Sequence, residues 1–125
     1  MALAEAIAPR TEEVVAKALL RAADLLGVSA KELSPVIGLS EATLSRLRRA
    51  PAGGSRMAGK PYELALLFIR LYRSLDAIMG GDDAAARRWL RAENAALGAP
   101  PLQRIRTVDG LAHVLAYLDA RRAPL

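Results

Sequence analysis

The sequence contains no cysteine and only one histidine, and aromatic residues make up 4% of its 125 residues. Without cysteine the chain forms neither structural disulfides nor thiolate metal sites. His113 has no second histidine as a metal partner, Asp82 and Asp83 are adjacent, and no glycine-rich phosphate loop follows a strand. Because no set of catalytic groups is assembled, we expect no enzyme activity, no metal and no cofactor.

Long apolar runs are also missing. The strongest run, Leu64 to Ile69, is far too short to span a bilayer. The N-terminal residues 1–9 include Glu5 and lack the basic region of a secretory signal. We therefore expect a soluble cytoplasmic protein with no membrane partner.

Helix-forming residues dominate what is present. Hydrophobic residues make up 53% of the chain, enough to bury a core, and alternating strand-forming residues are absent. Leu, Ala and Arg are good helix formers, so the composition predicts an all-α fold, a small helical bundle. The formal net charge of +5 fits a polyanionic partner such as DNA, RNA or an anionic membrane surface, without choosing among them.

The chain divides into four segments. Residues 1–10 are predicted to be a flexible arm that Pro9 ends, with the first helix beginning at Thr11. Residues 11–50 form a first helical region, residues 51–60 read as a loop (P-A-G-G-S-R-M-A-G-K), and residues 61–125 form a second helical region. Since the chain is short for two separate folds, we expect the two regions to share packing.

The first region carries a helix-turn-helix pattern. Ser29 and Glu32 form a capping box before a short helix that Pro35 should distort and Gly38 should end, and Ser40 caps the next helix. The spacing matches phage-repressor-like motifs at Leu33, Ile37, Gly38, Leu44 and Leu47.

This pattern predicts a DNA-reading helix. The second helix presents short polar residues and arginines, and no acidic residue falls between Glu41 and Glu63. The candidate DNA-binding residues are Ser40, Glu41, Ala42, Thr43, Ser45, Arg46, Arg48, Arg49 and Lys60. The alternative is an ordinary helical hairpin with a solvated basic face.

A helix predicted from Pro61 to Met79 is apolar on more than one face. Such a helix is buried nearly all round, either as the central helix of the core or at a subunit interface. The sequence does not decide between these two interpretations. The candidate dimerisation residues are Leu66, Ile69 and Arg73.

The stretch from Trp89 to Leu118 is the most specific part of the sequence. It resembles the toxin-binding domain of the Xre/MbcA/ParS antitoxin family over roughly residues 60–120. Glu93 and Ala99 depart from the family pattern at the bend. The matching positions are Trp89, Leu90, Asn94, Leu97, Gly98, Pro101, Leu102, Thr107, Gly110, Val114 and Leu118.

Several of these matching residues have a structural interpretation. We expect Trp89 to anchor the core, Asn94 to cap the turn that follows it, and Gly98 to be left-handed. Thr107 should cap the last helix. Gly110 lies early in that helix, where glycine is costly, and a close helix-to-helix approach would explain it.

The resemblance, together with the Xre-like helix-turn-helix before it, implies a type II antitoxin. Such a protein neutralises a NAD-consuming toxin of the RES-domain type by covering its active-site entrance, and as a homodimer represses its own operon by binding operator DNA. The implied toxin-binding residues are Tyr117, Asp119, Arg121, Arg122 and Leu125. The alternatives are a helix-turn-helix transcription regulator without a toxin partner, and an interaction protein that no longer reads DNA.

Overall fold

The computed structural model describes residues 2–50 and 57–122, and of residues 2–10 it describes the backbone alone. These described residues form seven helices and no strand, which confirms the all-α prediction. The helices are α1 (Ala2–Leu25), α2 (Ala30–Ile37), α3 (Glu41–Arg49), α4 (Lys60–Ile78), α5 (Asp83–Arg91), α6 (Pro101–Arg104) and α7 (Val108–Arg122). None of them is long and apolar enough to cross a membrane.

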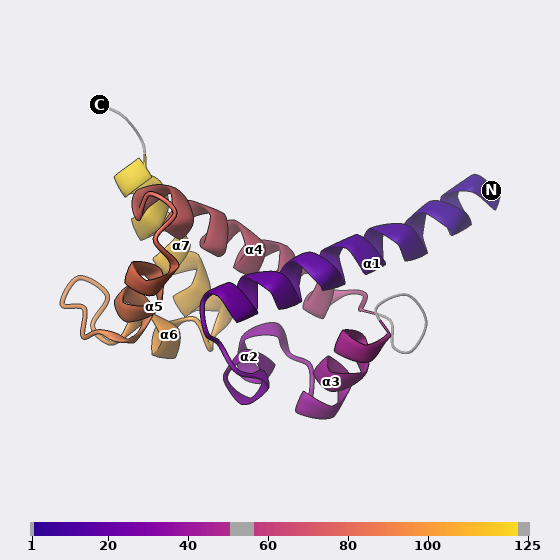
Figure 1. Ribbon diagram of the computed structural model, residues 1–125, viewed down its shortest axis with the longest axis horizontal. Helices are drawn as coiled ribbons and strands as arrows, with labels where there is room; N and C mark the ends of the chain where they lie inside the picture. Colours follow the sequence, from indigo (N-terminus) through magenta and orange to yellow (C-terminus); the bar gives the residue numbers. More distant parts are fainter. Residues whose placement is uncertain (1, 51–56, 123–125) are drawn as a thin grey trace.

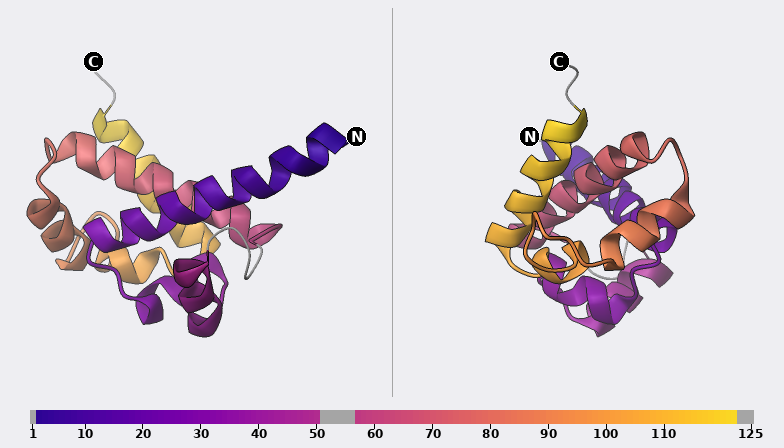
Figure 2. Two further views of the ribbon diagram at one scale, coloured as in Figure 1. Left: turned by 45° about the vertical axis from the view of Figure 1, so that its right-hand side comes forward. Right: turned by 90° about the vertical axis from the view of Figure 1, so that its left-hand side faces the viewer.

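Helix α4 is the central element of the bundle. It packs against α1, α2, α5 and α7, and so contacts both regions of the chain. Helices α2 and α3 lie beneath α1, while α5 and α6 lie at the opposite end of the molecule from the N-terminus (Figure 1). The N-terminal part of α1 extends beyond the other helices in both side views (Figure 1; Figure 2, left).

One continuous apolar core joins the two regions, as the chain length predicted. Phe68, Leu71 and Leu75 of α4 are fully buried at its centre. Leu19 of α1 and Leu111 of α7 are also fully buried in this core. Helix α4 is therefore a central core helix within a single chain.

The predicted helix ends are confirmed. Ser29 Oγ accepts a hydrogen bond from the Glu32 amide at 3.1 Å, and the Glu32 carboxylate accepts one from the Ser29 amide at 2.9 Å, completing the capping box. Gly38 ends α2 in the left-handed conformation, with φ 79°. A further cap is that of α5, where the Asp82 carboxylate accepts a hydrogen bond from the Ala85 amide at 3.0 Å.

The bend and the start of α7 also follow the sequence. Asn94 Oδ1 accepts a hydrogen bond from the Leu97 amide at 3.2 Å, and Gly98 is left-handed at φ 77°. Thr107 Oγ1 accepts one from the Gly110 amide at 3.0 Å. A Cβ on Gly110 would lie 1.8 Å from the Arg104 carbonyl oxygen, so the expected close approach is confirmed and its partner is the end of α6.

Three details differ from the expectations. Helix α1 begins at Ala2 and runs through Pro9 instead of beginning at Thr11, because the alanine-rich residues before Pro9 favour helix. Helix α2 continues through Pro35 to Ile37, since the proline removes a single hydrogen bond near the end of a short helix. The short helix α6, which begins at Pro101, was not predicted.

Candidate functional site

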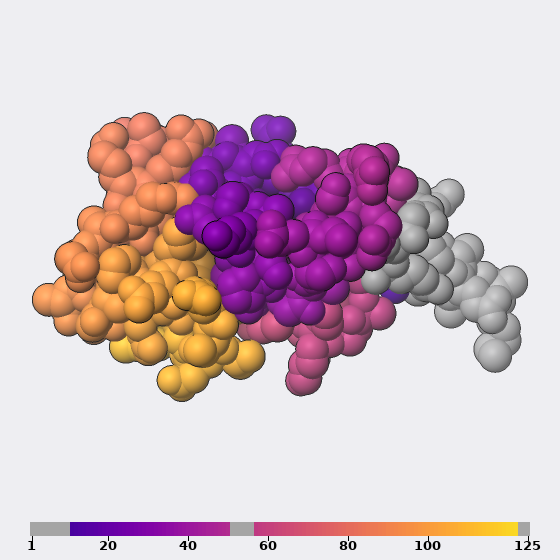
Figure 3. All heavy atoms as spheres, turned by 90° about the horizontal axis from the view of Figure 1, so that it is seen from below, coloured from indigo at the N-terminus to yellow at the C-terminus, as the bar shows by residue number. Residues whose placement is uncertain are grey.

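Helices α2 and α3 form the expected helix-turn-helix pair, joined at Gly38. Leu33, Ile37, Leu44 and Leu47 are all buried, at 2% exposure or less, and hold the pair against the core. The turn is fixed by Ser34 Oγ, which donates a hydrogen bond to the Leu39 carbonyl oxygen at 2.6 Å. The outer side of α3 lies on one face of the molecule, beside α2 (Figure 3).

The predicted DNA-binding residues at the start of α3 share a hydrogen-bonded chain. Ser40 Oγ accepts a hydrogen bond from the Thr43 amide at 3.1 Å and donates one to Thr43 Oγ1 at 2.9 Å. Arg46 Nη2 donates to the same hydroxyl at 3.1 Å. These contacts fix the side chains before any ligand binds, and all are exposed except the half-buried Thr43. Glu41, Ala42, Ser45 and Arg49 are exposed beside them.

Arg48, another predicted DNA-binding residue, is paired with a side chain of α1. Its guanidinium donates two hydrogen bonds to the Asp24 carboxylate of α1, both at 2.9 Å. This bidentate hydrogen bonding raises the pKa of Arg48 and fastens α3 to α1. Lys60, the last predicted DNA-binding residue, forms an exposed ion pair with Glu63 at 3.2 Å. Within the described residues, Arg49 is left without a hydrogen bond or ion pair.

At the other end of the molecule an aromatic–cation stack joins α5 and α7. The Trp89 and Tyr117 rings stack with centroids 6.2 Å apart at an interplanar angle of 21°. The Arg121 guanidinium lies over the Tyr117 ring, 4.5 Å from its centroid. Trp89 is half-buried against the core, so it anchors α5 and also supports the half-buried Tyr117 ring, on which the exposed Arg121 lies.

Asp119 and Arg122, also predicted toxin contacts, join a polar network between α4 and α7. Asp119 forms an ion pair with Arg70 and accepts a hydrogen bond from Ser74 Oγ at 3.4 Å. Arg122 Nη1 donates to Ser74 Oγ at 3.1 Å, and Ser74 is fully buried. This network holds the end of α7 on α4. Leu125 lies outside the described residues.

The candidate dimerisation residues differ in their exposure. Leu66 is 44% exposed and Arg73 is exposed, whereas Ile69 is 9% exposed within the single chain. Ile69 therefore belongs to the core of one subunit and leaves little surface for a second copy.

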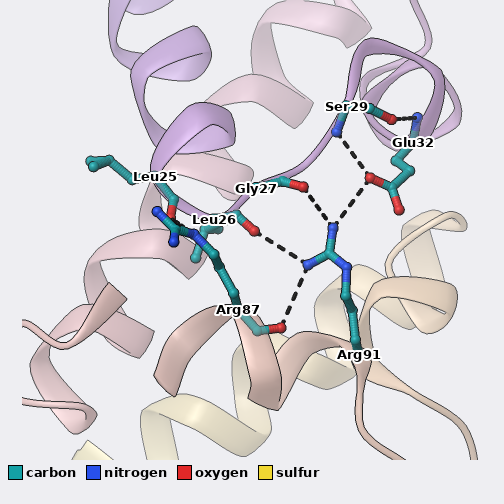
Figure 4. Close-up of polar contacts among 7 residues, drawn as sticks. All are labelled: Leu25, Leu26, Gly27, Ser29, Glu32, Arg87 and Arg91. Carbon is teal, nitrogen blue, oxygen red and sulfur yellow. Dashed lines mark hydrogen bonds and ion pairs between the residues drawn. The ribbon is translucent and has the colours of Figure 1, made fainter. Parts of the chain in front are cut away.

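Two arginines of α5, which the sequence analysis did not single out, clamp the corner between α1 and α2 (Figure 4). Arg87 Nε donates to the Leu25 carbonyl oxygen at 2.9 Å. Arg91 donates to the carbonyl oxygens of Leu26, at 3.3 Å, and Gly27, at 2.7 Å. These are carbonyls at the C-terminal end of α1, where the helix dipole favours cations. In the sequence, the i,i+4 spacing of the two arginines places them on one face of a helix and could have indicated that they act together.

The clamp also reaches the capping box of α2. Arg91 Nη2 lies 3.3 Å from Glu32 Oε1, the oxygen that accepts the Ser29 amide (Figure 4). The hydrogen bond from the Ser29 backbone lowers the pKa of Glu32, and the charge of Arg91 lowers it further. Helix α5 is thus joined through one carboxylate to the first helix of the helix-turn-helix pair.

Comparison with known families agrees with this arrangement. Residues 5–70 match the antitoxin Xre-like helix-turn-helix domain, and residues 74–123 match the antitoxin Xre/MbcA/ParS C-terminal toxin-binding domain. The two matched regions adjoin within α4, which packs on helices from both. A search of curated proteins finds no match to the chain.

The first of these matches covers more than half of the chain, and the second covers most of the rest. The helix-turn-helix pair with its exposed α3 falls in the first matched region, and the aromatic–cation stack of α5 and α7 falls in the second. The protein therefore belongs to the Xre/MbcA/ParS family of type II antitoxins, with an Xre-like helix-turn-helix followed by a toxin-binding domain.

Proposed function

We propose that this antitoxin neutralises a RES-type, NAD-consuming toxin by direct binding and represses its own operon as a homodimer. The observation that carries the proposal is the presence, in one chain with one core, of an exposed α3 and a region matching a toxin-binding domain. Ser45 and Arg49 are exposed on the outer side of α3, which supports the binding of DNA to that side.

Charge and side-chain order support operator binding. Arg46 and Arg49 are exposed on α3, and the chain carries a net charge of +5. Short polar residues at the start of α3 are of the size that approaches base edges in a major groove, and arginine pairs with guanine or phosphate. Two copies are needed to read a two-fold symmetric operator. Val14 and Leu66, exposed by 64% and 44% on the packed helices α1 and α4, offer apolar surface for that pairing.

The end of α7 supports toxin binding. Arg121 and Arg122 lie in its last turn, where cations are favoured, and each is held by a partner within the chain. A pair of positioned guanidinium groups suits an anionic pocket such as one that binds a dinucleotide. The stacked rings of Tyr117 and Trp89, both half-buried, lie beside them.

Co-expression with a RES-type toxin tests the toxin side. We expect the full chain to restore growth and to co-purify with the toxin, and we expect a chain trimmed of residues 121–125 to protect poorly. The trimmed chain should still bind operator DNA, because the helix-turn-helix lies at the other end of the bundle. The unchanged DNA binding serves as its folding control.

Two outcomes would reject parts of this proposal. Full protection by the trimmed chain would remove the C-terminal tail from the neutralising surface. If the full chain bound operator DNA but neither protected against the toxin nor co-purified with it, the protein would be a transcription regulator without a RES-type partner.

A further inference from the structure

A surface groove runs between α2, in the helix-turn-helix region, and α6, in the toxin-binding region. Its volume is about 440 Å³. Pro35, Pro100 and Leu102 contribute apolar walls. The polar side chains that line it are Lys31, Glu32, Arg91, Gln103 and Arg106. We call this feature the α2–α6 groove.

The side chains that line the α2–α6 groove carry more positive than negative charge. Lys31, Arg91 and Arg106 face a single carboxylate, that of Glu32. Glu32 is already engaged by the Ser29 amide and by Arg91, and Arg91 in turn is engaged by backbone carbonyl oxygens. The Arg91 charge is therefore neutralised locally, and the remaining surplus resides on Lys31 and Arg106.

Lys31 and Arg106 are free to take an external anion. Both are exposed, and within the described part of the chain neither side chain makes a hydrogen bond or an ion pair. The nearest acidic residue to Arg106 along the chain is Asp109, which is exposed on the first turn of α7 and forms no ion pair with it there. An exposed cation that no internal carboxylate neutralises favours an anionic partner.

The position of the groove indicates which anion. The first helix of a helix-turn-helix crosses the DNA backbone when the second helix enters the major groove. Here that first helix is α2, and its side forms one wall of the groove. Viewed from below, α2 and α3 and the orange segment that contains α6 lie side by side on one face (Figure 3). Phosphates that lie against α2 would therefore be next to the groove that Arg106 lines.

We propose that the α2–α6 groove binds the phosphates of DNA flanking the site that α3 reads, with Lys31 and Arg106 as the contacting residues. The toxin-binding region thereby contributes directly to operator affinity. This inference rests on the proposed operator binding, and it adds a contact from outside the helix-turn-helix. Phosphate contacts of this kind add affinity and fix orientation without reading sequence.

Titration of operator duplex by fluorescence anisotropy, at a series of salt concentrations, tests the proposal. The variants are Arg106→Gln and Lys31→Gln, with Arg88→Gln as the matched control. Arg88 is exposed on α5, does not line the groove and makes no described side-chain contact. Thermal unfolding checks that each variant folds like the unmodified protein.

We expect Arg106→Gln and Lys31→Gln each to weaken binding roughly threefold to tenfold and to lower the slope of log affinity against log salt by about one. Arg88→Gln should leave both quantities unchanged. On a duplex shortened to the base pairs that α3 covers, Arg106→Gln should bind like the unmodified protein, because the flanking phosphates are gone.

Other outcomes overturn the proposal in distinguishable ways. If the unmodified protein binds operator DNA and Arg106→Gln behaves like Arg88→Gln, the groove is not a DNA contact, while operator binding itself stands. If Arg106→Gln instead weakens toxin binding alone, the groove takes an acidic protein surface. If the unmodified protein binds no operator DNA, the proposed repressor function fails first.

Discussion

Arg48 and Arg49 stand next to each other in the sequence and have the same charge, yet their surroundings in the fold differ. Arg48 is held by the Asp24 carboxylate in a bidentate pair, whereas Arg49 has no described partner. A basic run in the sequence identifies an electrostatic surface. It does not identify which cations are already neutralised, because Asp24 is brought to α3 by the packing of α1.

Gly110 shows the strictest local constraint. Its missing Cβ would lie 1.8 Å from the Arg104 carbonyl oxygen and 2.7 Å from the carbonyl carbon. These are backbone atoms, so no side-chain rotation relieves the overlap. Glycine is needed at this position because α7 begins directly against the end of α6.

Gly110→Ala should therefore destabilise the protein, although alanine ordinarily favours a helix. We expect the free energy of unfolding in urea to fall by about 3 kcal/mol, the range of severe overpacking. Ala112→Gly, at an exposed position of the same helix, is the matched control and should cost about 1 kcal/mol through helix propensity alone. A Gly110→Ala variant as stable as the unmodified protein would contradict the close approach.

Among the elements, α5 has the most distinctive position, because its side chains serve two other parts of the molecule. Trp89 stacks on Tyr117 of α7, while Arg87 and Arg91 bind the corner between α1 and α2 (Figure 4). A toxin that covered Tyr117 would therefore contact a side chain that packs on α5. The same helix is hydrogen-bonded to the corner between α1 and α2. The two regions are joined by polar contacts as well as by the shared core.

Removal of the Arg91 clamp should weaken this joint. Arg91→Met keeps the apolar stem but removes the donors to the Leu26 and Gly27 carbonyl oxygens. The Arg91 side chain is 39% exposed, so solvent screens part of the interaction. We expect a loss of about 1–2 kcal/mol in the free energy of unfolding, together with faster amide hydrogen exchange near Gly27.

Arg88→Met is the control for this change. It alters the same helix at an exposed position with no described side-chain contact, and should change stability by less than about 0.5 kcal/mol. Equal effects of the two substitutions on stability and exchange would mean that the clamp contributes nothing to the joint.

Sequence reasoning worked well for elements whose ends carry a local signal. Ser29 and Ser40 cap helices because a short polar side chain satisfies free amides of the adjoining turn. It failed for α6, which is too short for hydrophobic periodicity to reveal, and for the start of α1, where Pro9 suggested a boundary. Local sequence signals therefore predict where a helix ends better than they predict whether a helix continues through a given residue.

The site was harder to predict than the fold. The exposed polar residues of α3 follow from helix periodicity, and so does the placement of Tyr117 and Arg121 one turn apart on α7. The Arg91–Glu32 pair and the α2–α6 groove depend on residues distant in the sequence that only the tertiary fold brings together. No periodicity within either helix contains that information.

In the whole molecule, one core carries both proposed interfaces, the α3 surface and the end of α7. Helix α4 packs on α1 on one side and on α7 on the other, so the regions do not form separate cores (Figure 2). The loop of residues 51–60 remains a predicted seam in the sequence, and residues 51–56 lie outside the described structure. If the two functions are separate although the core is shared, a surface substitution at one interface should leave binding at the other unchanged.

Arg46→Glu tests this separation most directly. Arg46 is exposed on α3 and donates to the Thr43 hydroxyl, far from the α7 stack. The measurement is the affinity of the folded variant for operator DNA and for the toxin, in parallel with an Arg88→Glu control. We predict that operator affinity falls by more than about tenfold, because a repulsive charge replaces a phosphate or base contact, while toxin affinity is unchanged. Loss of both affinities in a folded variant, or retention of operator binding, would contradict two separate interfaces on one antitoxin.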